Sequence, residues 1–248
     1  MAPRCLVPAR HDGEVTAQYP RGMETAEAYG IVRARLIELA AHLDDEQAAT
    51  MVPALPAWTV RDTYAHLAGL SAEVAAGELN RRATDEDTAR QVEQRKDRTL
   101  GELTAEWAGV APDVDALMSG PHARAFGLMA ADVWNHEMDI RGALSLPVQR
   151  TDAVCTGVAG FIAGLLDYQW RKYGLSPAVH FSTVEGGEWR IGAGEPAVSL
   201  RTSDYEFIRI LIGRRSRAQL LALDWDGDVE PLIDRLHLFD LPLADLSV

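Results

Sequence analysis

The chain has 248 residues, of which 47% are hydrophobic and 25% are charged, a composition that is ordinary for a folded protein and excludes a disordered one. Its 24 Lys and Arg residues stand against 37 Asp and Glu residues, and the formal net charge of -13 disfavours nucleic acid and membrane surfaces as partners, because both are anionic. The two cysteines, Cys5 and Cys155, exclude a disulfide scaffold and a cysteine-rich zinc module, and we expect a cytoplasmic protein.

Residues 1–23 are predicted to form a flexible leader before the fold. This segment contains Pro3, Pro8, Gly13 and Pro20 and has no apolar periodicity. It also lacks the apolar core of a secretory signal, and the chain has no run of roughly 18 apolar residues that would span a bilayer. We assign no function to the leader.

Apolar residues then recur three and four residues apart, as one face of a helix requires, along five segments. The expected helices cover residues 24–44, 60–80, 88–118, 123–144 and 152–173. A loop with Pro53 and Pro56 separates the first two helices, and Thr59 with Asp62 resembles a capping box at the start of the second. The fifth helix is expected to end at Gly174, because glycine commonly follows a helix.

The pattern changes after Pro177, where two strands are expected around a turn at Glu185, Gly186 and Gly187. The remaining expected elements are a strand at 197–203, a helix at 203–213, a strand within 220–228 and a docked apolar tail at 237–248. These elements predict a mainly α protein, in which a helical bundle precedes a small α+β domain. The predicted domains are the leader at 1–23, the bundle at 24–174 and the α+β domain at 175–248.

Asp132 and His136 are the most informative polar residues of the fourth predicted helix. They are four residues apart, so their side chains lie one above the other, with Cβ atoms about 6 Å apart. Because Val133 and Ile140 fall along much the same face, the pair is predicted to point into the bundle or to its rim. An unpaired carboxylate and imidazole are costly there, and a bound metal would remove that cost.

His66 in the second predicted helix offers a third ligand, since this helix packs in the same bundle. Two histidines and one carboxylate, with a fourth position left to water or substrate, are the composition of a catalytic zinc site, and helical bundles often build metal sites from facing side chains. Two other interpretations stay open on spacing alone: Asp132 and His136 as a hydrogen-bonded pair, and His66 as a core histidine with its hydrogen bonds satisfied. An HExxH protease motif is excluded, because residue 140 is Ile.

Three other features are weaker candidates. Cys155 lies in an apolar helix without a basic neighbour one turn away, which predicts an inert buried thiol. The glycine-rich segments do not follow the order of strand, phosphate loop and helix, so nucleotide binding is not supported. Arg214, Arg215 and Arg217 could grip an anion, but a solvated helix end is the preferred interpretation.

Two strings in these helices resemble a known family. WTVRDTYAHL, which contains His66, and DVWNHEMDIRGAL, which contains Asp132 and His136, look like the motifs of the mycothiol-dependent maleylpyruvate isomerase family, a branch of the DinB-like metalloenzymes. In that family the first motif supplies a histidine, and the second supplies a carboxylate, more often Glu, and a histidine, which hold a divalent metal, usually zinc. The resemblance implies His66, Asp132 and His136 as metal ligands in a DinB-like up-and-down bundle.

The resemblance extends beyond the bundle, because many members carry a C-terminal domain similar to sterol carrier proteins. VHFSTVEGGEWRIGAG, SLRTSDYEFIRILIGRRS and DWDGD look like parts of such a domain. It implies a sterol-carrier-like fold for the small α+β domain. The mapped ligand set also implies that His42, His122, His180 and His237 are not needed for the metal.

The function implied by the resemblance is a metal-dependent S-transferase or cis-trans isomerase of a small electrophile, with mycothiol as the low-molecular-weight thiol cosubstrate. The implied partners are the electrophile and the thiol, and we expect a monomer or a homodimer. Two alternatives remain. A metal-dependent hydrolase would turn over without a thiol. A non-catalytic binding protein would keep its small ligand when Asp132→Ala removes the metal.

Overall fold

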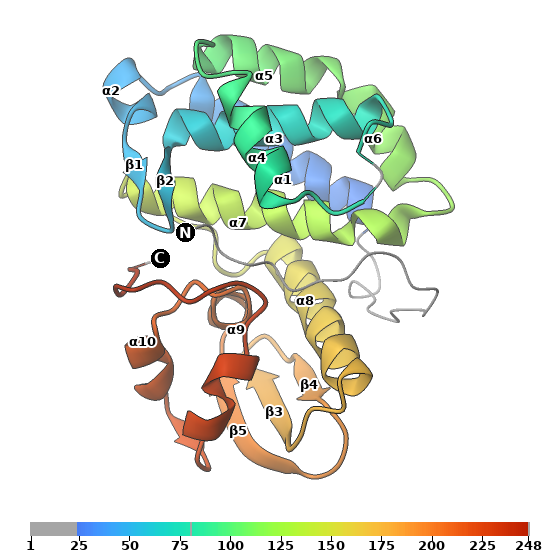
Figure 1. Cartoon of the computed structure of the whole chain (residues 1–248), viewed down its shortest axis with the longest axis vertical. Helices are drawn as coiled ribbons and strands as arrows, with labels where there is room; N and C mark the ends of the chain where they lie inside the picture. The colour runs from blue at the N-terminus through green and yellow to red at the C-terminus, as the bar shows by residue number, and fades with distance from the viewer. Residues whose placement is uncertain (1–23, 80, 248) are drawn as a thin grey trace.

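The computed structural model describes residues 24–247 with the exception of residue 80, so the predicted leader at 1–23 lies outside the described residues. A helical bundle occupies one end of the molecule, and a small sheet with short helices occupies the other (Figure 1). The protein is therefore mainly α, with a helical bundle followed by a smaller α+β part, as predicted.

The first part of the bundle follows the predicted order, with shorter helices. Its elements are α1 (Thr25–Ala40), α2 (Asp45–Ala48), β1 (Met51–Val52), β2 (Leu55–Thr59) and α3 (Val60–Ala75). The segment predicted as a proline-containing loop instead forms α2 and an antiparallel hairpin of β1 and β2. The capping box at the start of α3 is confirmed: Thr59 Oγ1 accepts from the backbone N–H of Asp62, whose carboxylate accepts from the backbone N–H of Thr59.

The single helix predicted over 88–118 is wrong, because this region forms three helices. They are α4 (Asp85–Glu93), α5 (Leu100–Gly109) and α6 (Ala111–Met118). Thr84 and Thr99 each cap a new helix through a capping box, and Pro112 lies in the first turn of α6. These start signals are local, and they interrupt a run of apolar residues whose spacing alone suggested continuity.

Two longer helices complete the helical part. A short 3-10 turn, η1 (Ala123–Phe126), leads into α7 (Gly127–Ala143), and α8 (Ala153–Lys172) follows. Asp152 caps α8, and Gly174 adopts a φ of 60° just after it, so the predicted start and stop of this helix are confirmed. In Figure 1, α7 lies on the side of the bundle that faces the α+β part, and α8 packs against α7, α9 and β4.

The C-terminal part is built on a four-stranded sheet of order β4-β3-β5-β6. Its elements are β3 (Ala178–Thr183), β4 (Glu188–Ile191), β5 (Pro196–Thr202), α9 (Asp204–Leu211), α10 (Arg217–Leu221), β6 (Trp225–Asp226) and η2 (Glu230–Arg235). β3 and β4 are antiparallel, as predicted, whereas β5 runs parallel to β3. The predicted strand within 220–228 is reduced to β6. Leu238 and Leu246 of the tail are buried, so the tail docks as expected.

One continuous apolar core extends through both parts. Trp107 and Trp134 are wholly buried in the bundle, and Trp170 near the end of α8 is buried against the C-terminal part, where its Nε1 donates to the carbonyl of Arg235. No helix among the described residues is long and apolar enough to cross a bilayer.

Candidate metal centre

Three side chains that are far apart in the sequence meet between α3 and α7. His66 comes from α3, and Asp132 and His136 come from successive turns of α7. One potential ligand atom of each lies within 4.8 Å of the other two. His66 Nε2 is 3.4 Å from Asp132 Oδ2, and His136 Nε2 is 3.3 Å from Asp132 Oδ1. The structure thus brings together all three residues that the sequence singled out.

Burial is uneven across this group. The side chains of His66 and His136 are 5% and 7% exposed, whereas that of Asp132 is 35% exposed. Two buried imidazoles therefore form the inner wall of the site, and the carboxylate lies at its mouth.

The contacts within the group fit a shared cation better than a tight ion pair. Both Nε2–oxygen distances exceed the roughly 2.7–2.9 Å of a charge-assisted hydrogen bond. Burial favours a raised pKa for Asp132, but the interactions with His136 and His66 outweigh it and hold the pKa below its ordinary value. An ionised carboxylate and two imidazole nitrogens aimed at one point are a donor set that suits zinc and similar divalent metals.

The Nδ1 atoms of the two histidines have different surroundings. His66 Nδ1 is 2.8 Å from Gln91 Oε1 of α4. His136 Nδ1 has no hydrogen-bond partner among the described residues, and its nearest acidic oxygen is Oδ2 of Asp139, 3.8 Å away. Neither Gln91 nor Asp139 was predicted from the sequence. Asp139 had a signal, because it lies one turn after His136, whereas Gln91 had none.

Asp139 also ties α7, the helix of Asp132 and His136, to the C-terminal part. Its wholly buried carboxylate accepts hydrogen bonds from Arg209 of α9, at 2.6 Å, and from Arg214, at 3.0 Å. Burial alone would raise the pKa of Asp139, but the two arginine charges lower it to about 2. The helix that carries Asp132 and His136 is thereby fixed by a charged contact between the two parts of the molecule.

Trp58 and Arg82 complete the surroundings. The Trp58 ring, from β2, lies 5.1 Å from the His66 ring and 6.2 Å from the His136 ring, measured between centroids. The Arg82 guanidinium lies over the Phe239 ring at 5.1 Å, and its buried Nη1 has no hydrogen-bond partner among the described residues. Burial lowers the pKa of Arg82, and the charge of Asp132 acts against this shift, so the guanidinium is within electrostatic reach of the site.

The remaining sequence candidates lie elsewhere. His42 and His122 are exposed, His180 contacts Glu188 on the sheet, and His237 Nδ1 donates to the carbonyl of Phe239. Cys155 is wholly buried, and burial raises the pKa of its thiol, in agreement with an inert cysteine.

The solvated helix end predicted for the arginine cluster is wrong for two of its three members. Arg214 bonds to Asp139, and Arg215 is buried against Glu206. Only Arg217 among the three is exposed, and it pairs with Asp234. The acidic partners come from other elements, so the spacing of the arginines did not reveal them.

Comparison with known proteins finds a family match within the bundle. Residues 29–141 match the family described as the mycothiol maleylpyruvate isomerase N-terminal domain. Crystal structures of a mycothiol-dependent maleylpyruvate isomerase and of a point mutant of it superpose with TM-scores of 0.56 and 0.55, at 13% and 12% sequence identity. Each comparison covers 77% of this chain and 88% of the other, and at this identity it shows a shared fold. No curated protein sequence matches the chain significantly.

Proposed function

Because residues 29–141 match the family of mycothiol maleylpyruvate isomerase N-terminal domains, we propose that the protein is a metal-dependent enzyme that uses mycothiol to isomerise or conjugate a small electrophile. The observation that carries the proposal is the convergence of His66, Asp132 and His136 on one partly open point. In this proposal the three side chains hold a divalent metal, with zinc the best match to the donor set.

A metal held in this way supplies one kind of chemistry: it stabilises the thiolate form of a thiol at neutral pH and so makes the thiol a nucleophile. The protein's own residues prepare the position. The buried side chains of His66 and His136 present their Nε2 atoms, and the more exposed Asp132 contributes a negative charge. The ring of Trp58 packs beside the two imidazole rings.

Arg82 is proposed to bind an anionic group of the electrophile. Its buried Nη1 retains a donor without a partner among the described residues, and the guanidinium lies over the ring of Phe239. A carboxylate is the group that an arginine donor recognises best. This assignment favours substrates that carry a carboxylate next to a reactive double bond.

We also propose the division into a bundle at 24–174 and a small domain at 175–248, with a sterol-carrier-like fold for the latter. The change from helices to strands after Pro177 supports the boundary. A cytoplasmic enzyme that works as a monomer or homodimer is consistent with this proposal.

The test is turnover of maleylpyruvate by the metal-loaded protein with mycothiol, with a different thiol and with no thiol. Thiol-dependent isomerisation or conjugation that Asp132→Ala abolishes is the expected result. Hydrolysis at equal rates with and without thiol would replace the proposal by a metal-dependent hydrolase. Ligand binding that persists in Asp132→Ala, without turnover in the parent, would indicate a binding protein.

A further inference from the structure

A chain of buried polar contacts leads from His66 through α4 and back to α3. His66 Nδ1 is 2.8 Å from Gln91 Oε1, and Gln91 Nε2 donates to Glu73 Oε2 at 2.7 Å. Gln91 is wholly buried, and Glu73 is 8% exposed. Buried polar groups persist when each finds its partner, so every member of this chain constrains the next one.

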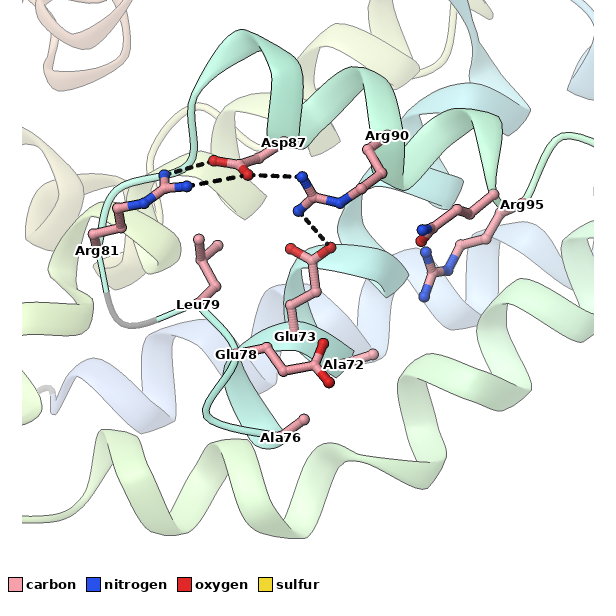
Figure 2. A pocket seen from close by; sticks show the side chains of 10 residues that line it. Ala72, Glu73, Ala76, Glu78, Leu79, Arg81, Asp87, Arg90 and Arg95 are labelled. Atoms are coloured by element: carbon pink, nitrogen blue, oxygen red, sulfur yellow. Dashed lines mark hydrogen bonds and ion pairs between the residues drawn. The ribbon is translucent and has the colours of Figure 1, made fainter.

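Glu73 is itself held from its other side. Arg90 donates to Glu73 Oε1 at 3.0 Å and to Asp87 Oδ1 at 2.9 Å, and Arg81 donates to the same Asp87 carboxylate. These contacts line a pocket of about 580 Å³, in which Figure 2 shows Arg90 between Glu73 and Asp87. Both oxygens of Glu73 thus accept from fixed donors, which leaves a carboxylate as the side chain that fits there.

The donors and acceptors in this chain have a required direction. A carboxylate has only acceptors, so the amide nitrogen of Gln91 must face Glu73. The amide oxygen of Gln91 must then face His66, and this oxygen can accept only from an Nδ1 that carries hydrogen. A neutral His66 with hydrogen on Nδ1 leaves the lone pair on Nε2, the atom that points towards Asp132.

We propose that Glu73 and Gln91 are positioning residues that fix the Nδ1–H tautomer of His66 and so keep Nε2 ready as a ligand. The proposal deepens the proposed function, and its metal-binding arm rests on that function. His136 has no corresponding hydrogen bond, since no described residue bonds to its Nδ1. Acting through His66, the pair sets the affinity of the site without touching a substrate.

The packing of α3 against α4 supports a dedicated contact. Gly69 lies on the same face of α3 as His66 and Glu73, at the spacing of one helical turn from each. A Cβ atom at Gly69 would lie 2.9 Å from Gln91 Cβ and 2.8 Å from Arg95 Nη1. The absence of a side chain at Gly69 therefore lets Gln91 approach the ring of His66.

The first experiment measures the tautomer directly, without metal or activity. Nitrogen-15 NMR of His66 in the full-length protein, stripped of metal at pH 9, distinguishes a ring nitrogen that carries hydrogen from one that does not. We expect hydrogen on Nδ1 in the parent and loss of this preference in Gln91→Leu. Hydrogen on Nε2 in the parent, or an unchanged tautomer in Gln91→Leu, would overturn the proposal.

The second experiment measures the dissociation constant for Zn²⁺ and the visible spectrum of the Co²⁺ form. Gln91→Leu is expected to weaken Zn²⁺ binding about 10- to 100-fold, the usual effect of losing a hydrogen bond to a ligating histidine. Gln94→Leu is the matched control, because it makes the same change at an exposed residue directly after α4. It is expected to leave the dissociation constant and the spectrum unchanged.

An exchange of the two side chains separates hydrogen-bond direction from packing. Glu73→Gln alone places an amide between the donors of Arg90 and Gln91, where two acceptors are needed. Gln91→Glu alone places two carboxylates next to each other. Each single variant is therefore expected to weaken Zn²⁺ binding. The double variant Glu73→Gln/Gln91→Glu restores an acceptor towards His66, a donor from position 73 to position 91 and an acceptor towards Arg90. The Zn²⁺ affinity of the double variant is expected to recover to within about threefold of the parent affinity. A double variant no better than the weaker single variant would refute the proposal.

The two claims fail separately. If the parent binds no metal, the metal centre fails, while the NMR measurement still decides whether Glu73 and Gln91 set the tautomer. If the parent binds metal but shows no thiol chemistry, the proposed reaction fails and both arms of this test remain valid.

Discussion

Among single residues, Arg82 is the one that we propose to bind an anionic group of the electrophile. Its guanidinium has a buried donor without a partner among the described residues and lies over the ring of Phe239, and both features are lost in Arg82→Met. We expect this variant to raise the KM for a carboxylate-bearing electrophile at least tenfold and to leave the Kd for Zn²⁺ unchanged. Steady-state kinetics beside a metal titration checks the prediction, and equal KM values in variant and parent would contradict it.

Tyr29 provides a second prediction at this scale, on stability. Its hydroxyl bonds to Ser71 Oγ at 2.7 Å and accepts from Trp107 Nε1 at 2.9 Å, which ties α1 to α3 and α5. Tyr29→Phe leaves Trp107 Nε1 without this acceptor. The free energy of unfolding should fall by about 1–3 kcal/mol, as measured by urea denaturation at pH 8.

The stability contribution of Tyr29 should also depend on pH. Burial raises the pKa of Tyr29 from 10.0 to about 12, so between these values the unfolded chain loses a proton that the folded protein retains. The contribution is complete below about pH 10 and is lost as the pH rises through about 12. The difference in unfolding free energy between parent and Tyr29→Phe should therefore shrink over this interval; a constant difference would contradict the assignment.

At the scale of elements, local signals explain both what the sequence predicted and what it did not. The bounds of α8 followed from its apolar face and from Gly174, and the structure adds Asp152 as its cap. The division of the region after residue 84 was missed, although the capping residues Thr84 and Thr99 were visible. The short strands β1 and β2 carry too few residues to show a period of two.

The candidate site also contains residues that local sequence signals predict and residues that they do not. Asp132 and His136 were predictable, because their spacing is a property of one helix. Gln91 was not, because its contact with His66 depends on how α4 lies across α3, at a distance of 25 residues along the chain. A side chain that contacts the far ring nitrogen of such a histidine is placed there by tertiary packing. Tertiary packing of this kind leaves no periodic pattern in a single sequence.

Gly127, the first residue of α7, gives a prediction at this scale. A Cβ atom there would lie 2.2 Å from Cε2 of Phe161 on α8, far inside van der Waals contact. Gly127→Ala should lower the free energy of unfolding by about 1–3 kcal/mol through overpacking. Gly127→Ala/Phe161→Leu, which makes room for the methyl group, should be more stable than Gly127→Ala with Phe161 intact. Thermal denaturation of the three proteins checks this order, and equal stability of parent and Gly127→Ala would contradict it.

Across the whole molecule, Asp139 couples α7, the helix of Asp132 and His136, to the C-terminal part. Both Asp139 and its partner Arg209 have 0% exposed side chains, and removing one partner of such a pair leaves the other charge buried. Asp139→Leu should lower the free energy of unfolding by about 3–5 kcal/mol, measured by urea denaturation. Glu93→Gln, which removes the exposed pair with Lys96, should leave the midpoint unchanged. A loss below about 1 kcal/mol in Asp139→Leu would show that this contact does not hold the two parts together.

The central claim is that His66, Asp132 and His136 bind one metal ion. The most direct test is the metal content of the untagged protein, purified without chelator and measured by plasma mass spectrometry beside His136→Ala and His42→Ala. We expect close to one equivalent of divalent metal in the parent and in His42→Ala, and a loss of most of it in His136→Ala. A parent that stays free of metal after incubation with zinc, or a His136→Ala variant that retains a full equivalent, would contradict it.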